Sequence, residues 1–148
     1  MIRIRDMKEE DVPQIMKIEK ACYDEPWDSV HFFFQLERKE PCNWVASENT
    51  DICAYINCCK WGDELHVNNI AVREDMRGRG IAQRLLDRAI AFAMEYRLEI
   101  IRLEVNENNQ CARDFYHKNG FVETGRIPDY YENGSSNALI LSKELETT

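Results

Sequence analysis

One glycine-rich stretch of the sequence has the residue types of a phosphate-binding loop. Its six residues are Arg77, Gly78, Arg79, Gly80, Ile81 and Ala82. Glycine lets a backbone approach a ligand closely, and the amides that begin a helix are hydrogen-bond donors at the positive end of its dipole. We therefore expect a phosphate-bearing ligand at this stretch. The alternative is a turn that only starts a helix, since the spacing matches neither of the two standard nucleotide-binding loops.

A carboxylate within an apolar segment is the second chemical signal. The segment 100–105 reads Ile-Ile-Arg-Leu-Glu-Val, which predicts a strand that contains Glu104. A carboxylate is costly to bury unless it is used or paired, so Glu104 is a candidate for acid–base chemistry. Because side chains alternate across a strand, a solvated carboxylate on the outward face is the alternative.

Both signals are positioned by a predicted strand, helix and second strand. The first strand covers about 64–72, and the strongest helical pattern of the sequence extends from Gly80 to Tyr96. The strand at 100–105 follows this helix. Such a connection usually places two strands in parallel, with the glycine-rich stretch between the first strand and the helix.

The remaining segments predict one α/β (α+β) domain over residues 1–148, a length typical of a single domain. Asp6, followed by Glu9, resembles a capping box for a helix that ends near Cys22. Asp28 or Ser29 begins a second helix to about Arg38, and Gly62-Asp63 has hairpin-turn chemistry. Further strands are expected at 2–5, from Asn43, at 52–60, near 121–126 and near 137–142, with a helix at about 109–118.

The net charge and the spacing of the cysteines limit which binding partners and ligands we expect. With 27 acidic and 19 basic residues, the net charge of −8 should repel nucleic acids and anionic membrane surfaces. Charged residues occupy the start of the chain, where a signal peptide needs an apolar core, so we expect a cytoplasmic protein. Its six cysteines form no Cys-x-x-Cys pair, which favours free thiols over a metal site.

The glycine-rich stretch resembles the acetyl-coenzyme A motif of the Gcn5-related N-acetyltransferase (GNAT) superfamily, Gln/Arg-x-x-Gly-x-Gly/Ala, at Arg77, Gly80 and Ala82. The resemblance covers nearly the whole chain. It continues through Ile70-Ala71-Val72, Leu103-Glu104-Val105, the segment from Asn109 to Tyr116, and Gly120-Phe121. Pro26-Trp27 and Tyr130-Tyr131 are similar to the bacterial members that acetylate the N-terminal alanine of a ribosomal protein.

The resemblance implies a mixed sheet of about seven strands flanked by about four helices, and acetyl-CoA as co-substrate. The amides from Arg77 to Ala82 would hold the pyrophosphate. The strand segment Ile70-Ala71-Val72 would pair with the pantetheine arm through the backbone of its first and last residues. Asn109 would bind or position the pantetheine, and as a favoured N-cap residue it could also cap a helix.

By the same resemblance, acetyl transfer is direct and uses two catalytic side chains. Glu104 would be the general base, directly or through water, and Tyr116 the general acid for the coenzyme sulfur. For Tyr116, core packing beside Phe115 is the alternative. Close relatives commonly carry arginine where this chain has Asn106, so one contact with the substrate is expected to differ.

Acceptor recognition is expected at Glu25 and Trp27, between the first two helices, and at Tyr130 and Tyr131, between the last two strands. Carboxylates and aromatic rings at these places suit a cationic peptide. The favoured function is acetylation of a protein N-terminus, with a basic small-subunit ribosomal protein as partner. A superfamily enzyme for a small-molecule amine and a non-catalytic acetyl-CoA-binding module remain as alternatives.

Overall fold

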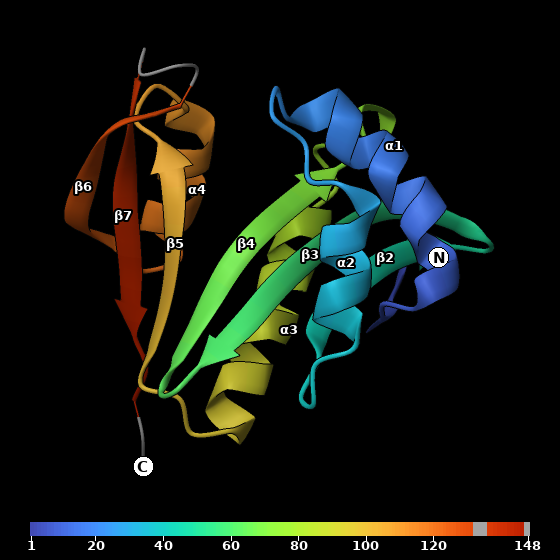
Figure 1. Ribbon diagram of the computed structural model, residues 1–148, viewed down its shortest axis with the longest axis horizontal. Helices are drawn as coiled ribbons and strands as arrows, with labels where there is room; N and C mark the ends of the chain where they lie inside the picture. Colours follow the sequence, from blue (N-terminus) through green and yellow to red (C-terminus); the bar gives the residue numbers. More distant parts are fainter. Residues whose placement is uncertain (132–135, 147–148) are drawn as a thin grey trace. The chain divides into compact units, whose positions relative to one another are not determined.

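The computed structural model describes residues 1–131 and 136–146 (Figure 1). The strands are β1 (Arg3–Asp6), β2 (Cys42–Glu48), β3 (Asp51–Trp61), β4 (Glu64–Val72), β5 (Ile100–Asn106), β6 (Val122–Tyr131) and β7 (Ser136–Glu144), and the helices are α1 (Val12–Cys22), α2 (Ser29–Leu36), α3 (Ile81–Glu95) and α4 (Gln110–Lys118). The strands form one sheet in the order β1-β2-β3-β4-β5-β7-β6. The predicted α/β fold with seven strands and four helices is confirmed.

The chain forms two compact units. The first unit comprises Met1–Lys60 and Val67–Phe92, and the second comprises Trp61–His66 and Ala93–Thr148. β4 therefore contributes its first residues to the second unit and the remainder to the first. The glycine-rich stretch belongs to the first unit and the predicted catalytic residues to the second.

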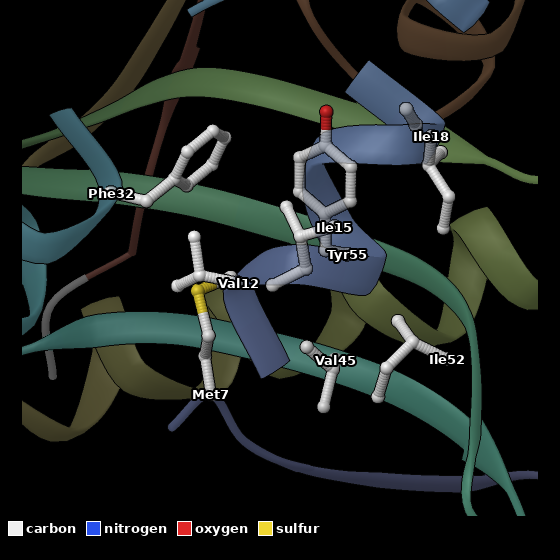
Figure 2. Packing of buried hydrophobic residues seen from close by; sticks show 9 residues of the cluster. Met7, Val12, Ile15, Ile18, Phe32, Val45, Ile52 and Tyr55 are labelled. Atoms are coloured by element: carbon white, nitrogen blue, oxygen red, sulfur yellow. The ribbon is translucent and has the colours of Figure 1, made fainter. Parts of the chain in front are cut away.

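In the first unit, a buried apolar cluster fixes α1 and α2 on the sheet. α1 contributes Val12, Ile15 and Ile18, whose spacing of three residues places them on one helix face (Figure 2). Phe32 of α2 packs edge-on against Tyr55 of β3, with ring centroids 5.7 Å apart. Burial of each such side chain stabilises the fold by roughly 1.5–3 kcal/mol, so this cluster sets the position of both helices.

The start of α1 differs from the sequence prediction. Asp6 is the last residue of β1, paired with Trp44 of β2, so the predicted capping box of Asp6 and Glu9 is wrong. Asp11 supplies the carboxylate instead: it accepts two hydrogen bonds of 2.8 Å from Arg5 and one of 2.8 Å from the amide of Lys8. The helix begins only after a turn of 3-10 helix at Glu9–Asp11.

In the second unit, β7 lies between β5 and β6 and pairs antiparallel with both. Along β5, Leu103 and Val105 are buried, while Arg102 and Glu104 occupy the other face. β6 is longer than predicted because its pairing with β7 extends to Tyr131 and Ser136. The alternation of β5 therefore presents a polar side-chain row on one face of this unit.

Candidate active site

The glycine-rich loop connects the end of β4 to α3 within the first unit. Gly78 and Gly80 have φ angles of +79° and +74°, in the left-handed region that favours glycine. A Cβ at either position would meet no atom within 4 Å, so the loop is open above both glycines. Together with the first-turn amides of the long helix α3, this open loop fits a pyrophosphate group.

The backbone at the end of β4 is bonded to side chains. The hydroxyl of Tyr23 donates to the carbonyl of Ile70 at 2.8 Å and accepts from the Ile70 amide at 3.3 Å. The guanidinium of Arg77 donates to the carbonyl of Val72 at 3.1 Å. Backbone atoms expected to pair with pantetheine thus have partners within the protein, and Ala71 is part of the buried cluster. Pantetheine would have to replace the bonds at Ile70.

Glu104 forms a close pair with His66 in the second unit. His66 Nε2 lies 2.5 Å from Glu104 Oε2, and the two side chains are 27% and 25% exposed. Two residues earlier on the same strands, Arg102 bonds to Glu64 at 3.1 Å. Glu104 is therefore a paired, partly solvated carboxylate in a polar row.

The two tyrosines of the last hairpin belong to the same unit. Tyr130 and Tyr131 pack with ring centroids 4.7 Å apart, and Tyr130 is 49% exposed. Burial, the neighbouring Tyr130 and the charge of Glu104 raise the pKa of Tyr131 to about 12. Tyr131 thus stays protonated at neutral pH and lies within electrostatic reach of Glu104.

Tyr116 and Asn109 lie at the two ends of α4. Tyr116 is 5% exposed, and its ring packs against Phe115 and Phe121 with centroids 5.2 and 5.4 Å away. Core packing is therefore present at Tyr116, and its role as general acid stays a prediction. Asn109 caps the helix by accepting the amide of Ala112 at 3.1 Å, which confirms the capping role.

Glu25 and Trp27 lie in the α1–α2 connection of the first unit. Glu25 is exposed, as a carboxylate that meets a cationic acceptor should be. The Trp27 ring is partly buried against His31 and Phe32, with centroids 5.2 and 5.4 Å away. Much of its aromatic surface therefore anchors the loop to α2.

Asn106 closes the end of β5. It donates to the hydroxyl of Ser136 on β7 at 3.1 Å, and it accepts the amide of Asn108 at 2.9 Å. Asn106 thus ties two strands and a turn together.

Sequence reasoning did not identify Glu19, which is fully buried in the first unit. Its carboxylate accepts 2.9 Å bonds from the Trp27 amide and the Asn69 side chain, and a close one from the Tyr55 hydroxyl. Its place on α1, four residues after Ile15, was the available signal. His66 was also missed, because only strand pairing brings it to Glu104.

The described residues show a few further features. A hollow of about 230 Å³ lies beside α4 and is lined by Gln110, His117 and Leu139 among others, but not by Glu104. All six cysteines are free thiols. Within the described chain, no three side chains of metal-binding type gather into a site, and no helix is both long and apolar enough to cross a membrane.

Comparison with known proteins identifies the family. The sequence model of the Acetyltransferase (GNAT) family matches residues 12–121. The N-alpha-acetyltransferase of Sulfurisphaera tokodaii is 31% identical over 151 residues, covering 93% of this chain and 90% of that protein. The ribosomal protein bS18-alanine N-acetyltransferase of Escherichia coli is 26% identical over 144 residues, covering 96% of this chain and 97% of that protein.

A solved structure shows the same fold. The crystal structure of the ribosomal-protein-S18-alanine N-acetyltransferase from Escherichia coli superposes with a TM-score of 0.91 at 25% identity, covering 100% of this chain and 96% of that one. The family model matches residues 12–121, and the structural similarity covers the whole chain. The chain belongs to the GNAT family of acetyltransferases and is an acetyl-CoA-dependent N-acetyltransferase.

Proposed function

We propose that the protein, as one domain over residues 1–148, acetylates the α-amine of a protein N-terminus. The acceptor is the N-terminal alanine of a basic small-subunit ribosomal protein in the cytoplasm. The observation that carries this proposal is the partly exposed, paired Glu104 within electrostatic reach of Tyr131. The relatives from Sulfurisphaera tokodaii and Escherichia coli, whose names specify N-terminal chemistry, support the same choice of amine.

In the proposed reaction, the coenzyme is held by the loop from Arg77 to Ala82, by the backbone of Ile70 and Val72, and by Asn109. The fit of the open loop to a pyrophosphate supports the first contact. Side chains of Tyr23, just after α1, and of Arg77 in the loop already bond to the β4 backbone, which supports its capacity to pair with an extended ligand.

The chemical step needs an uncharged amine and a proton for the leaving thiolate. The amine nitrogen forms a bond to the acetyl carbon, and the carbon–sulfur bond breaks. Glu104 receives the amine proton, directly or through water, and Tyr116 gives its phenolic proton to the coenzyme sulfur. These two side chains account for both protons, so the reaction as proposed uses no metal.

Electrostatics favours an α-amine over a lysine side chain. An α-amine has a pKa of about 7.7–8.0 against about 10.4 for lysine, so roughly a tenth or more of it is uncharged at pH 7, against far less than a hundredth of lysine side chains. Glu25 in the first unit and the net charge of −8 favour acceptors with basic residues after the terminus. Tyr130 and Tyr131 offer rings and hydroxyls for the peptide backbone.

The test is acetylation of two peptides that share one sequence, beginning with alanine and carrying early arginine and lysine residues. One peptide has a free terminus and the other a formylated terminus. We expect transfer to the free α-amine only, located by mass spectrometry, with a rate that falls as salt rises. Transfer to lysine side chains, or only to added polyamines, would contradict the choice of acceptor but not the acetyltransferase activity.

The general acid needs a separate test because Tyr116 is buried among aromatic rings. Tyr116→Phe removes only the hydroxyl and keeps the packing. If the hydroxyl protonates the thiolate, turnover falls by roughly 10²–10⁴-fold at unchanged coenzyme affinity. Tyr96→Phe, on an exposed tyrosine, is the matched control. Wild-type turnover in Tyr116→Phe would limit Tyr116 to packing.

A further inference from the structure

We propose that the outer face of α2 is a docking surface for the acceptor protein, and that it binds a cationic, apolar segment that follows the acetylated terminus. The proposal rests on the proposed function and deepens it, because it states what the acceptor needs beyond its first residues. The outer face consists of three apolar residues of α2 and the residue that caps its end: Val30, Phe33, Phe34 and Glu37.

Apolar side chains project from two sides of α2, whereas a helix at a protein surface usually has one apolar face. The inner side carries Phe32, which is fully buried in the cluster of the first unit (Figure 2). On the outer face, Val30 is 67% exposed, Phe34 63% and Phe33 37%. Packing of α2 on the sheet therefore accounts for Phe32 but not for the three apolar residues of the outer face.

The apolar residues of the outer face lie close enough to be covered by one partner. Val30 is three residues before Phe33 and four before Phe34, so both rings are its neighbours on the helix surface. The three residues extend over about 6 Å of the helix axis. Exposed apolar patches on soluble proteins mark interaction sites, and aromatic side chains are enriched at the centres of interfaces.

The charges around the outer face favour a cationic occupant. Glu37 is exposed and follows Phe33 by four residues and Phe34 by three, so its carboxylate lies beside the two rings. Three further acidic residues are exposed directly before the helix: Asp24, Glu25 and Asp28. Lysine or arginine side chains in a bound segment would complement these carboxylates, while the neighbouring apolar side chains of that segment cover the rings.

The basic residues that follow α2 do not cancel this charge. Arg38 donates a hydrogen bond to the carbonyl of Lys60 at 3.1 Å, and Lys60 is itself paired with Glu40 at 3.5 Å. Residues 24–40 contain five acidic residues and, in Arg38 and Lys39, two basic ones. The surface around the outer face is therefore acidic.

The place of α2 in the chain favours the acceptor as the occupant. Glu25 and Trp27, the proposed acceptor contacts, directly precede the helix, and the Trp27 ring packs against Phe32 with centroids 5.4 Å apart. A terminus recognised at these residues has its following residues next to α2. A second copy of this chain would bring two net charges of −8 and two copies of Glu37 together, which is electrostatically unfavourable.

The kinetic experiment uses two peptides that begin with the same alanine and basic residues. The short peptide ends there, and the long one continues with an amphipathic segment of leucine and arginine. For the long peptide, Phe34→Ser and Glu37→Lys should each raise KM roughly tenfold with kcat unchanged, the effect of losing one interface anchor. Values for the short peptide should not change. Val122→Ser, at a 58% exposed position of β6, is the control.

A binding experiment separates this proposal from the proposed function. The fluorescent leucine- and arginine-rich segment with a blocked terminus contains no amine, so its binding does not depend on which amine is acetylated. Its affinity should fall roughly tenfold in Phe34→Ser and in Glu37→Lys. If it binds as expected but the long peptide is not acetylated, the docking surface is supported and the proposed function is contradicted.

Two results would overturn the docking surface. The first is equal affinity of the blocked segment for the wild type and both variants, which would leave the proposed function intact. The second is self-association of the wild type in sedimentation that Phe34→Ser abolishes, with no binding of the segment, which would assign the outer face to a second copy of the chain. Phe34 and Glu37 are exposed, and a lysine near a helix C-terminus is favourable, so both variants should fold.

Discussion

Two glutamates, one in each unit, contrast in their surroundings. Glu19 is fully buried, and its carboxylate oxygens are occupied by hydrogen-bond donors from three segments of the first unit. Glu104 is about a quarter exposed and is in close contact with His66. A carboxylate surrounded by fixed donors holds structure together, whereas one with a titratable partner and access to solvent can exchange a proton.

This contrast shows that burial of a carboxylate is a poor guide to reactivity in this protein. Glu104 is a candidate from the sequence because a charge in an apolar strand should be costly to bury. In the structure the costly burial falls on Glu19, and strand alternation places Glu104 on a polar face. Replacing each glutamate by glutamine measures how much each carboxylate contributes to turnover and to stability.

The largest expected effect is on catalysis at Glu104. Glu104→Gln should lower turnover by roughly 10²–10⁴-fold, the usual contribution of a positioned proton acceptor. Its free energy of unfolding should change by less than about 1 kcal/mol, because a partly exposed pair contributes little to stability. Steady-state kinetics and urea unfolding of the same preparation give both values. Near wild-type turnover would remove the contrast between the two glutamates.

The reverse is expected for Glu19. Glu19→Gln places an amide NH₂ against the donors of Trp27 and Asn69, and should lower the free energy of unfolding by about 2–4 kcal/mol. Turnover of the folded variant at saturating substrate should stay within a few-fold of wild type. Urea unfolding measures the first effect, with Glu10→Gln at an exposed position as control. A loss of unfolding free energy under about 1 kcal/mol would contradict the structural role of Glu19, because it would mean that the donors of Trp27 and Asn69 readily find other partners.

A third carboxylate sharpens the comparison, because Asp11 is both buried and ion-paired. Burial tends to raise its pKa, but bonds from Arg5 and the Lys8 amide outweigh burial and leave the pKa below the ordinary value. A lowered folded-state pKa stabilises the protein above the unfolded value, near 3.9, and this contribution disappears as the pH falls through the folded-state pKa.

Asp11→Asn should therefore cost about 1–2 kcal/mol of unfolding free energy at pH 7, and progressively less below about pH 4. Urea unfolding at a series of pH values tests this, with the exposed Asp24→Asn as control. A difference that grows on acidification would mean that Asp11 is stabilised in its protonated form.

The smallest effect is expected at Tyr23, which directly follows α1, the helix that carries Glu19. Tyr23→Phe frees the Ile70 amide and carbonyl for pantetheine, so acetyl-CoA should bind about three- to tenfold more tightly, the value of one modest hydrogen bond. Titration calorimetry of wild type and variant measures this. Weaker binding would instead make the hydroxyl part of the coenzyme site.

Local patterns predicted most of the elements. The helical periodicity from Gly80 to Tyr96 became α3 at Ile81–Glu95, and the predicted turn has Gly62 at φ +58°. The strands at 121–126 and 137–142 were predicted too short, because pairing between β6 and β7 extends them. Pairing across strands is a non-local property that a pattern within one segment does not contain.

The site could be predicted only in part, for the same reason. The loop could be predicted from the residue type of Gly78 and Gly80 alone. Their positive φ angles are those that glycine favours. His66 had no local signal, since its importance comes from a neighbour 38 positions away. Asp11 replaced Asp6 as the carboxylate before α1 because Asp6 is occupied by strand pairing.

The side chains bonded to the end of β4 also protect the protein from other chains. Unpaired backbone groups of a strand are a template on which extended segments add, and this leads to aggregation. Tyr23 bonds both backbone groups of Ile70, and Arg77 bonds the carbonyl of Val72. The segment that we propose to pair with the coenzyme arm is thereby shielded from unrelated polypeptides.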